Sequence, residues 1–290
     1  MTDRFASHEA LLEGLHARHR RRRLIPRAGA DFSSNDYLGL SQPPELRQIV
    51  IAAIERGVAI GSGGSRLLRG NDAEHEVLEA EAAAFFGTES ALFFSGGFTA
   101  NATLFACLPQ SGDFVVHDSL IHASAYEGLR GGRATYKAFV HNEAQAASDT
   151  IAAWRRGGGT GRVWIAVESL YSMDGDQAPL ADLLAVADRH DAILVIDEAH
   201  ATGVLGRDGR GLASDLEGRD NVISLHTCGK AMGVQGGLLC GPAILRDFLV
   251  NFSRPFIFAT APSPLMAAAV RGVLNLMRDR PSAANASPTS

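Results

Sequence analysis

Short apolar segments recur along this chain, and helical patterns lie between several of them. A short, continuous apolar segment bounded by turn residues is typical of a strand that is buried on both faces of a sheet. Strands that alternate with helices favour an α/β fold with a mostly parallel sheet flanked by helices. The expected strands are Ala91–Phe94, Phe114–Val116, Val163–Val167, Ile193–Ile196, Val222–Leu225 and Leu238–Leu239.

Helical spacing of apolar residues predicts several helices along the chain. They are expected over residues 8–20, 44–57, 72–86, 98–107, 180–190 and 264–277. In the helix over 72–86, the inner side is expected to carry Val77, Leu78, Ala82 and Phe85. Residues 281–290 are small and polar, include proline and lack a hydrophobic period, so we expect them to be disordered.

The composition fits a globular protein with a substantial core. The chain has 290 residues, of which 46% are hydrophobic, and a formal net charge of −5. This acidic balance argues against a nucleic-acid surface, so we interpret the basic run Arg20–Arg23 as a solvated helix end. The N-terminus lacks the apolar core of a signal peptide, and no segment is long enough to cross a bilayer. The 3 cysteines lack metal-ligand spacing, which predicts reduced thiols in a cytoplasmic protein. From the acidic charge balance and the lack of a long apolar segment, we expect contact with neither nucleic acid nor membrane.

Two segments carry the strongest chemical signal. The apolar segment that begins at Leu194 ends in Asp197 and His200, as expected where polar groups follow the C-terminal end of a buried parallel strand. Lys230 stands between glycine and alanine, three residues after Thr227, which leaves its amine accessible. An acid at a strand end and an accessible lysine on a separate loop are what a pyridoxal phosphate site requires. The lysine bonds to the cofactor, and the carboxylate keeps the pyridine nitrogen protonated so that the ring accepts electrons.

Two further strand ends offer groups that suit such a site. Gly96 and Gly97 follow a strand and open a helix, so backbone N–H groups there can close on a phosphate; an ordinary strand-to-helix turn is the alternative. The glycines lack the GxGxxG spacing, so a dinucleotide site has little support. His122 is followed by two small residues, which leaves room beside it for a flat ring; a buried core histidine is the alternative.

Other chemistries have weaker support. Asp174 and Asp176 crowd one loop, where turn chemistry explains them as well as metal binding does. The tetrapeptide from Asp197 to His200 also matches the acidic magnesium motif of helicases, which requires a phosphate-binding loop ending in Gly-Lys-Ser or Gly-Lys-Thr. The only Gly-Lys here is followed by alanine and lies after the acid, which excludes a helicase. The sequence also lacks the HExxH, CxxC and GxSxG motifs of zinc and serine chemistry.

Taken in order along the chain, the motifs resemble those of the α-oxoamine synthases, which condense an amino acid with an acyl-CoA and release CO2. The resemblance extends from about Arg21 to about Met277. Its motifs are Ser34–Ser41, Gly61–Arg66, Ser95–Asn101, His122–Ser124, Ser172–Asp176, Asp197–Gly203 and Thr227–Lys230. The resemblance implies an aspartate-aminotransferase-like large domain of fold type I and pyridoxal 5'-phosphate as the cofactor.

The same resemblance implies catalytic roles for four residues. Lys230 bonds to the cofactor and serves as acid and base at the substrate α-carbon. Asp197 pairs with the pyridine nitrogen, and His200 reaches the phenolic oxygen of the ring. His122 stacks over the ring face.

Other residues are expected to bind the cofactor or the substrates. Backbone N–H groups of Gly97 and Phe98 and the hydroxyl of Thr227 bind the phosphate, and Ser172 supports the ring region beside the histidine. Asn35 lies near the amino-acid carboxylate, and Arg21 lies near the acyl substrate. No metal is expected.

The arginines before Asn35 and the glycine-rich loop over 61–65 favour one reaction within this family. It joins L-alanine to pimeloyl-CoA, or to pimeloyl carrier protein, in biotin biosynthesis. Members that use glycine or serine are the alternative. Because family members are homodimers with active sites at the interface, a homodimer is expected.

The chain departs from the family at its C-terminal end. Family members continue into a small C-terminal domain, which supplies an arginine for the substrate carboxylate, whereas residues 281–290 match nothing in the family. We therefore expect the small domain to be missing through a frameshift, and a non-catalytic remnant is the second functional hypothesis. The expected domains are an N-terminal helix and segment over 1–42, a cofactor-binding large domain over 43–278 and a tail over 279–290.

Overall fold

The computed structural model describes residues 4–279, which divide into two units between Ser34 and Asn35. The first unit contains α1 (Ala6–Ala17), a helix without a buried residue that ends before the predicted limit of residue 20. The second unit contains the sheet and the remaining helices. The tail that we expected to be disordered lies outside the described residues from 280 onward, and the three domain ranges stay a prediction. No helix within 4–279 is long and apolar enough to cross a membrane.

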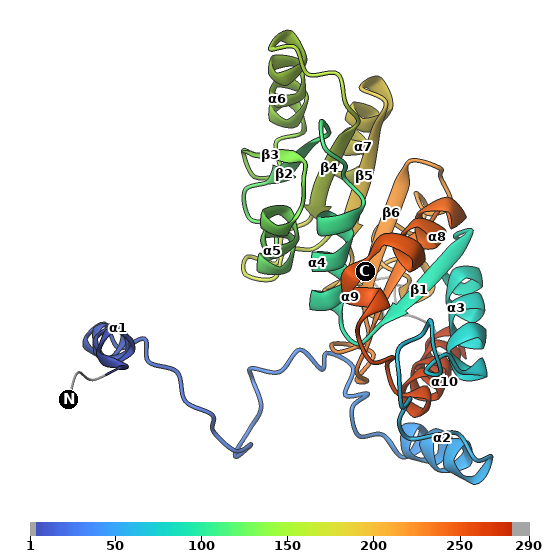
Figure 1. The fold of residues 1–290 in the computed structure, drawn as a ribbon. Coiled ribbons are helices and arrows are strands. Elements are labelled where there is room, and N and C mark those ends of the chain that lie inside the picture. The colour runs from blue at the N-terminus through green and yellow to red at the C-terminus, as the bar shows by residue number, and fades with distance from the viewer. Residues whose placement is uncertain (1–3, 280–290) are drawn as a thin grey trace, which may run out of the picture. The chain divides into compact units, whose positions relative to one another are not determined.

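The second unit is built on one sheet with the strand order β1-β7-β6-β5-β4-β2-β3 (Figure 1). The five strands from β6 to β3 are parallel, whereas β7 pairs antiparallel with both of its neighbours. The prediction of a mostly parallel sheet is confirmed. The strands are β1 (Ser90–Phe94), β2 (Phe114–Asp118), β3 (Thr135–Phe139), β4 (Val163–Glu168), β5 (Ala192–Asp197), β6 (Val222–Thr227) and β7 (Gly237–Gly241).

Helices cover both faces of this sheet because the strands are apolar on both faces. In β4, Val163 and Ile165 pack in the cluster that includes α6 and α7, whereas Trp164 packs in the cluster with α4, α5, α8 and α9. The cluster with α3 and α10 packs against β1 and β7. The helices are α2 (Pro44–Glu55), α3 (Ala73–Phe86), α4 (Gly97–Cys107), α5 (Ala123–Gly131), α6 (Ala144–Arg156), α7 (Leu180–Arg189), α8 (Ala243–Phe252), α9 (Arg254–Ile257) and α10 (Pro264–Asp279), with a short 3-10 turn at Arg207–Gly209.

The sequence patterns gave wrong or missing predictions where only one face of a helix or strand is buried. The predicted elements omit β3, an edge strand whose first four residues are exposed, because a strand of that kind carries no apolar run. The inward position expected for Val77 is wrong, since its side chain is 38% exposed. Leu78 lies about 100° further round α3 and is buried, so the inner stripe starts there.

Candidate active site

The predicted chemical residues gather at the carboxyl ends of the parallel strands. A cavity of about 200 Å³, open to solvent, lies beside the ends of β4, β5 and β6 and the first turn of α4. In open α/β sheets this edge is where ligands bind, because the loops that follow parallel strands all leave there. The lining residues are Gly97, Phe98, His122, Ser124, Glu168, Asp197, Ala199, His200, Leu225, Thr227 and Lys230.

Asp197 is the last residue of β5 and presents a buried carboxylate to this cavity. Its Oδ1 accepts a hydrogen bond from the backbone N–H of Ala199 at 2.9 Å, and its Oδ2 accepts one from Asn101 Nδ2 at 2.9 Å. Burial raises the pKa of Asp197, while the Ala199 N–H and the Lys230 ammonium oppose that rise. A cation placed in the cavity against this carboxylate therefore gains a buried partner of opposite charge.

A chain of hydrogen bonds connects Asp197 to His122. Asn101 Nδ2 also donates to Ser124 Oγ at 2.9 Å, and that hydroxyl lies 2.7 Å from His122 Nδ1. His122 caps α5, where its Nδ1 also accepts from the Ser124 N–H at 3.2 Å. The ring of His122 is thereby held at the cavity wall, although it is exposed rather than buried in the core. The sequence prediction did not nominate Asn101 and Ser124, which position the two predicted residues.

Lys230 lies on the loop between β6 and β7, and its amine lines the cavity. Burial lowers the pKa of Lys230, and the carboxylates of Asp197 and Glu168 raise it in opposition. A lowered pKa increases the share of neutral amine at neutral pH, which is the nucleophilic form. Gly233 closes the same loop by donating its N–H to the Lys230 carbonyl at 2.9 Å.

His200 lies between the lysine and a turn near the start of the second unit. Its Nε2 lies 2.6 Å from Lys230 Nζ, and its Nδ1 lies 2.7 Å from Tyr37 Oη. Burial, Lys230 and His122 together lower the pKa of His200 to about 4, so its ring is neutral at neutral pH. Tyr37 in turn donates to Asn35 Oδ1 at 3.0 Å. The structure thus connects Asn35 to the lysine through Tyr37 and His200. The sequence prediction did not single out Tyr37.

The first turn of α4 forms a cradle with Thr227. No side chain caps this helix at Gly96. The backbone N–H groups of Gly97 and Phe98, two residues that line the cavity, therefore lack the acceptor that a capping side chain would provide. A Cβ on Gly97 would lie 2.9 Å from Thr227 Oγ1, so only glycine allows this close approach. Thr227 Oγ1 accepts the Gly229 N–H at 3.4 Å, which leaves its own proton free to donate. Unpaired N–H groups at a helix N-terminus and a free hydroxyl are the donors that a phosphate needs.

Glu168 is a further acidic group that the sequence prediction passed over. It ends β4 as the register partner of Asp197, and its buried side chain lines the same cavity. Burial and the neighbouring Asp197 carboxylate raise the pKa of Glu168 to about 8, against the opposing effect of Lys230. The signal was present in the sequence, because this acid also directly follows an apolar strand.

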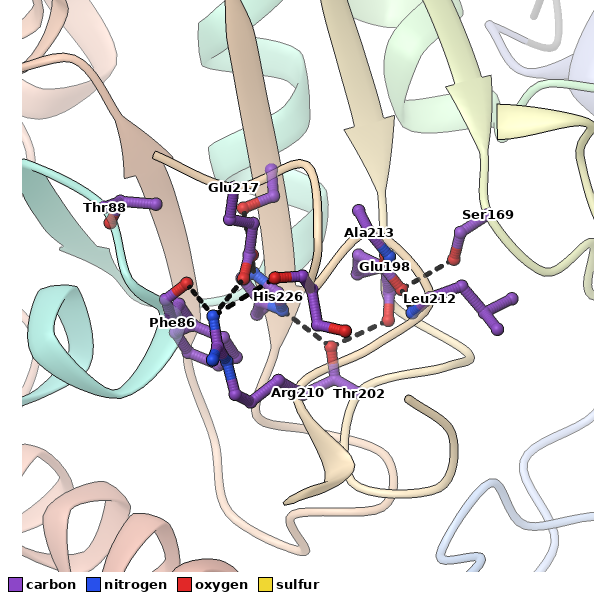
Figure 2. Close-up of polar contacts among 12 residues, drawn as sticks. Phe86, Thr88, Ser169, Glu198, Thr202, Arg210, Leu212, Ala213, Glu217 and His226 are labelled. Carbon is purple, nitrogen blue, oxygen red and sulfur yellow. Dashed lines mark hydrogen bonds and ion pairs between the residues drawn. The ribbon is translucent and has the colours of Figure 1, made fainter. Parts of the chain in front are cut away.

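Residues next to the cavity residues in the sequence form a buried polar network (Figure 2). Glu198 follows Asp197, and its carboxylate accepts hydrogen bonds from Ser169 Oγ at 2.6 Å and from the backbone N–H groups of Leu212 and Ala213. The Glu198 carbonyl accepts from Thr202 Oγ1 at 2.8 Å. These contacts hold the end of β5 against the start of the loop after β4 and against the loop that precedes β6.

The network continues to the end of β6 (Figure 2). His226 Nδ1 lies 2.8 Å from Thr202 Oγ1, and its Nε2 lies 2.9 Å from Glu217 Oε1. Its ring stacks on Phe86 at a centroid distance of 3.6 Å. Each strand-end member of the network is the sequence neighbour of a cavity residue, as His226 is of Thr227. Successive side chains of a strand point to opposite faces of the sheet. At these strand ends, one side chain therefore lines the cavity, while its neighbour on the other face makes the hydrogen bonds that hold the strand end in place.

Three predicted site residues do not line this cavity. Ser172 is exposed on the turn between β4 and α7, and its role beside the ring stays a prediction. Asn35 reaches the cavity only through the hydrogen bond from Tyr37. Arg21 is an exposed residue of the first unit, and its role toward the acyl substrate stays a prediction.

Of the two loop acids for which metal binding was an alternative, Asp176 has protein partners and Asp174 is exposed. Asp176 Oδ2 lies 2.7 Å from His141 Nε2 and accepts from Asn142 Nδ2 at 2.6 Å. Within residues 4–279, no group of three or more His, Cys, Asp or Glu side chains is arranged to hold a metal ion. The three cysteines are free thiols.

The cavity residues fit pyridoxal phosphate. A lysine amine, a buried carboxylate and a glycine–threonine cradle line one cavity, and they match the aldehyde, the ring nitrogen and the phosphate of that cofactor. Among the described residues, the hydrogen-bond donors to the buried carboxylate of Asp197 are the neutral Asn101 amide and the Ala199 N–H, so a pyridinium can serve as its cationic partner.

A family model and curated proteins of known name both match most of this chain. The chain matches the model of the family described as aminotransferase class I and II over residues 28–283. It is similar to the 8-amino-7-oxononanoate synthase of Mycolicibacterium smegmatis, with 40% identity over 261 residues that cover 89% of this chain and 67% of that protein. The enzyme of the same name from Chromobacterium violaceum is 43% identical over 255 residues, which cover 87% and 65%. The chain therefore spans about two thirds of the length of these curated relatives.

Solved structures are similar in fold. Serine palmitoyltransferase of Sphingomonas wittichii has a TM-score of 0.82 at 26% identity, covering 96% of this chain and 73% of that one. The 8-amino-7-oxononanoate synthase of Francisella tularensis has a TM-score of 0.71 at 28% identity, covering 86% and 69%. A serine palmitoyltransferase of S. paucimobilis with a TM-score of 0.82, at 25% identity and covering 95% and 72%, contains bound PLP. The predicted aspartate-aminotransferase-like fold and pyridoxal 5'-phosphate as the cofactor are confirmed.

Proposed function

This chain belongs to the aminotransferase class I and II family, and from that premise we propose that it is a pyridoxal-phosphate-dependent acyltransferase of biotin biosynthesis. The reaction joins L-alanine to pimeloyl-CoA or pimeloyl carrier protein and yields 8-amino-7-oxononanoate, CO2 and the free thiol. One observation carries the proposal. Lys230, Asp197 and the cradle of Gly97 and Thr227 line a single cavity. Relatives of the chain at 40% and 43% identity are named 8-amino-7-oxononanoate synthase.

The cavity residues have separate tasks in this proposal. Lys230 holds the cofactor, Asp197 pairs with the ring nitrogen, and His200 contacts the phenolic oxygen. Gly97 and Phe98 donate backbone N–H groups to the phosphate, and Thr227 donates its hydroxyl. His122 covers one face of the ring, and Ser172 supports the ring region beside His200. Asn35 lies near the alanine carboxylate, and Arg21 lies near the acyl chain.

Pyridoxal phosphate supplies an electron-accepting ring next to the α-carbon of the amino acid. Once the alanine amine has displaced Lys230 from the cofactor, the freed lysine amine would take the α-proton of alanine and later return a proton to the product. Its lowered pKa suits this task, because a base that works near neutral pH must be neutral in a useful fraction of molecules. His122 blocks one face, so that the acyl group approaches from the other.

Absorption spectroscopy of the purified full chain tests the proposal. Addition of pyridoxal phosphate is expected to produce a visible band that L-alanine perturbs, followed by release of CoA when pimeloyl-CoA is added. Lys230→Ala removes the amine that bonds to the cofactor, so this variant is expected to lack the band. If the band persists in Lys230→Ala, and borohydride abolishes it while fixing the cofactor to the protein, another amine holds the cofactor and the assignment is wrong.

One structural observation favours a second substrate class. Serine palmitoyltransferases superpose with a TM-score of 0.82, which exceeds the 0.71 of the F. tularensis synthase, although their sequence identity is lower. An enzyme that uses serine or glycine is therefore the alternative. Parallel assays with alanine, serine and glycine, each with pimeloyl-CoA and palmitoyl-CoA, distinguish the two. Cofactor binding without turnover of any pair would instead support the non-catalytic hypothesis.

A homodimer in the cytoplasm is part of the same proposal. Phe98 lines the cavity with a side chain that is 54% exposed, and a second copy of the chain would cover such a surface. The three free thiols suit a reducing compartment. Light scattering of the purified protein tests the dimer, and a monomer at micromolar concentration would count against it.

A further inference from the structure

A continuous line of hydrogen bonds connects Asn35 to Lys230 across two loops. The atoms are Asn35 Oδ1, Tyr37 Oη, both ring nitrogens of His200, and Lys230 Nζ, with separations of 3.0, 2.7 and 2.6 Å. A tyrosine hydroxyl has one proton, and here it points at Asn35 Oδ1, an oxygen that can only accept. Tyr37 Oη must therefore accept from His200 Nδ1, which places the imidazole proton on Nδ1.

The tautomer of His200 follows from that assignment. A neutral imidazole carries one N–H, so a proton on Nδ1 leaves Nε2 with a free lone pair. This lone pair faces Lys230 Nζ at 2.6 Å and accepts a hydrogen bond from its ammonium form. The ring is neutral because its pKa is lowered to about 4. His200 therefore favours the protonated lysine in this arrangement, while the opposite tautomer would favour the neutral amine.

The turn that carries Tyr37 packs against the loop that carries Lys230. Leu40 is buried, and Gly233 of the lysine loop packs so closely on it that a Cβ there would lie 2.2 Å from the Leu40 carbonyl carbon. Within the turn, the Gly39 N–H donates to the Asp36 carbonyl at 3.0 Å and the Ser41 N–H donates to Asp36 Oδ2 at 3.2 Å. This packing keeps the hydroxyl of Tyr37 at a set distance from His200.

We infer that Tyr37 is a positioning residue that, with Asn35 as its acceptor, holds His200 in the Nδ1–H tautomer and so directs the Nε2 lone pair at Lys230. The inference rests on the proposed role of Lys230 and adds a residue that sets the proton balance of that site. The charged and titratable groups that face the lysine amine are Asp197, Glu168 and His200, with His122 beside His200. Tyr37 acts on the amine only through His200.

Nitrogen NMR of the cofactor-free full chain with 15N-labelled histidine tests the inference directly. The His200 signals, assigned with a His200→Asn variant, are expected to show a protonated Nδ1 and an unprotonated Nε2. Tyr37→Phe removes the acceptor for Nδ1–H, so a substantial share of His200 is expected to change to the Nε2–H form. Asn35→Leu frees the tyrosine proton to bind Nδ1, and is expected to reverse the tautomer. If His200 keeps the same tautomer in both variants, the inference is overturned.

A second measurement follows the lysine. The pH midpoint for capture of pyridoxal phosphate by the apo protein is expected to fall by about one pH unit in Tyr37→Phe, because the Nε2–H form stabilises the neutral amine. Tyr136→Phe is the matched control: Tyr136 is 41% exposed, against 46% for Tyr37, and lies on the edge strand β3 outside the cavity. An unchanged midpoint in Tyr37→Phe would contradict the inference. Failure of every variant and of the wild type to capture the cofactor would refute the proposed function, while the tautomer data would still decide this inference.

Discussion

A methyl group on Gly97 tests the cofactor cradle with a single added carbon. A Cβ there would lie 2.9 Å from Thr227 Oγ1 and 3.0 Å from Thr227 Cβ, whereas comfortable carbon contacts start at about 3.5 Å. Gly97→Ala therefore requires Thr227 to move away by roughly half an ångström or more. The hydroxyl of Thr227 then leaves the position from which it donates to the phosphate.

The size of the effect follows from the bond that is lost. A hydrogen bond to a charged group contributes about 1.5–3 kcal/mol, so the Kd for pyridoxal phosphate is expected to rise by about 10- to 100-fold in Gly97→Ala. Alanine is a better helix former than glycine, so the helix itself is not weakened by this change. The loss is therefore expected in cofactor binding rather than in the stability of α4.

Titration of the apo protein with pyridoxal phosphate, followed by absorbance, measures this Kd. Gly96→Ala is the matched control, because nothing lies within 4 Å of a Cβ at Gly96 and its φ of 179° is extended backbone that alanine adopts readily. Cofactor affinity of Gly96→Ala is expected to stay within about twofold of wild type. Equal Kd values for Gly97→Ala and the control would show that Thr227 and α4 do not hold the phosphate together.

Two further predictions concern buried acids. The folded-state pKa of Glu168 is raised to about 8, so the folded apo protein retains a proton that the unfolded chain loses above its ordinary pKa of 4.5, and stability falls as the pH rises through that interval. Glu168→Gln mimics the protonated acid. Its free energy of unfolding in urea is expected to exceed that of wild type at pH 8, by at most about 5 kcal/mol, and to match it near pH 4.5. If the unfolding free energies of the variant and of wild type changed equally with pH, this reasoning would be contradicted. Glu79 accepts from Arg66 Nη1 at 2.8 Å and from the Phe93 N–H at 3.0 Å, so Glu79→Ala leaves a buried guanidinium unpaired and is expected to cost about 3–5 kcal/mol of unfolding free energy. Glu127→Ala, which breaks an exposed ion pair, is expected to cost less than about 1 kcal/mol, and similar losses for both variants would refute the role of burial.

Local patterns were sufficient for the centre of the fold. The apolar segments that became β1, β2, β4, β5, β6 and β7 are strands because residues buried on both faces of a sheet leave an unbroken apolar signal. The edge strand β3 and the helices α5, α6 and α8 lacked so strong a signal. Val77 shows the same limit, since helical spacing identifies a stripe but not which neighbouring positions face the sheet.

Strand-end polar residues were predictable for a related reason. Asp197, Lys230 and His122 stand out in the sequence because polar side chains follow directly after apolar strands or small residues, and parallel strands bring those ends to one edge. The residues that support them gave no such signal. Asn101 and Ser124 are ordinary helix residues until the fold places them between Asp197 and His122.

The sequence by itself determined the strand–helix order and the chemical groups of the site, because both are encoded in runs of neighbouring residues. Only the tertiary structure decided how those groups interact. Tyr37 and His200 are 163 positions apart in the sequence, yet a hydrogen bond of 2.7 Å joins their side chains. The pKa of Glu168 depends on its burial and on an acid of the adjacent strand. Distances, solvent exposure and the path of a proton depend on packing between distant segments, and no local pattern contains them.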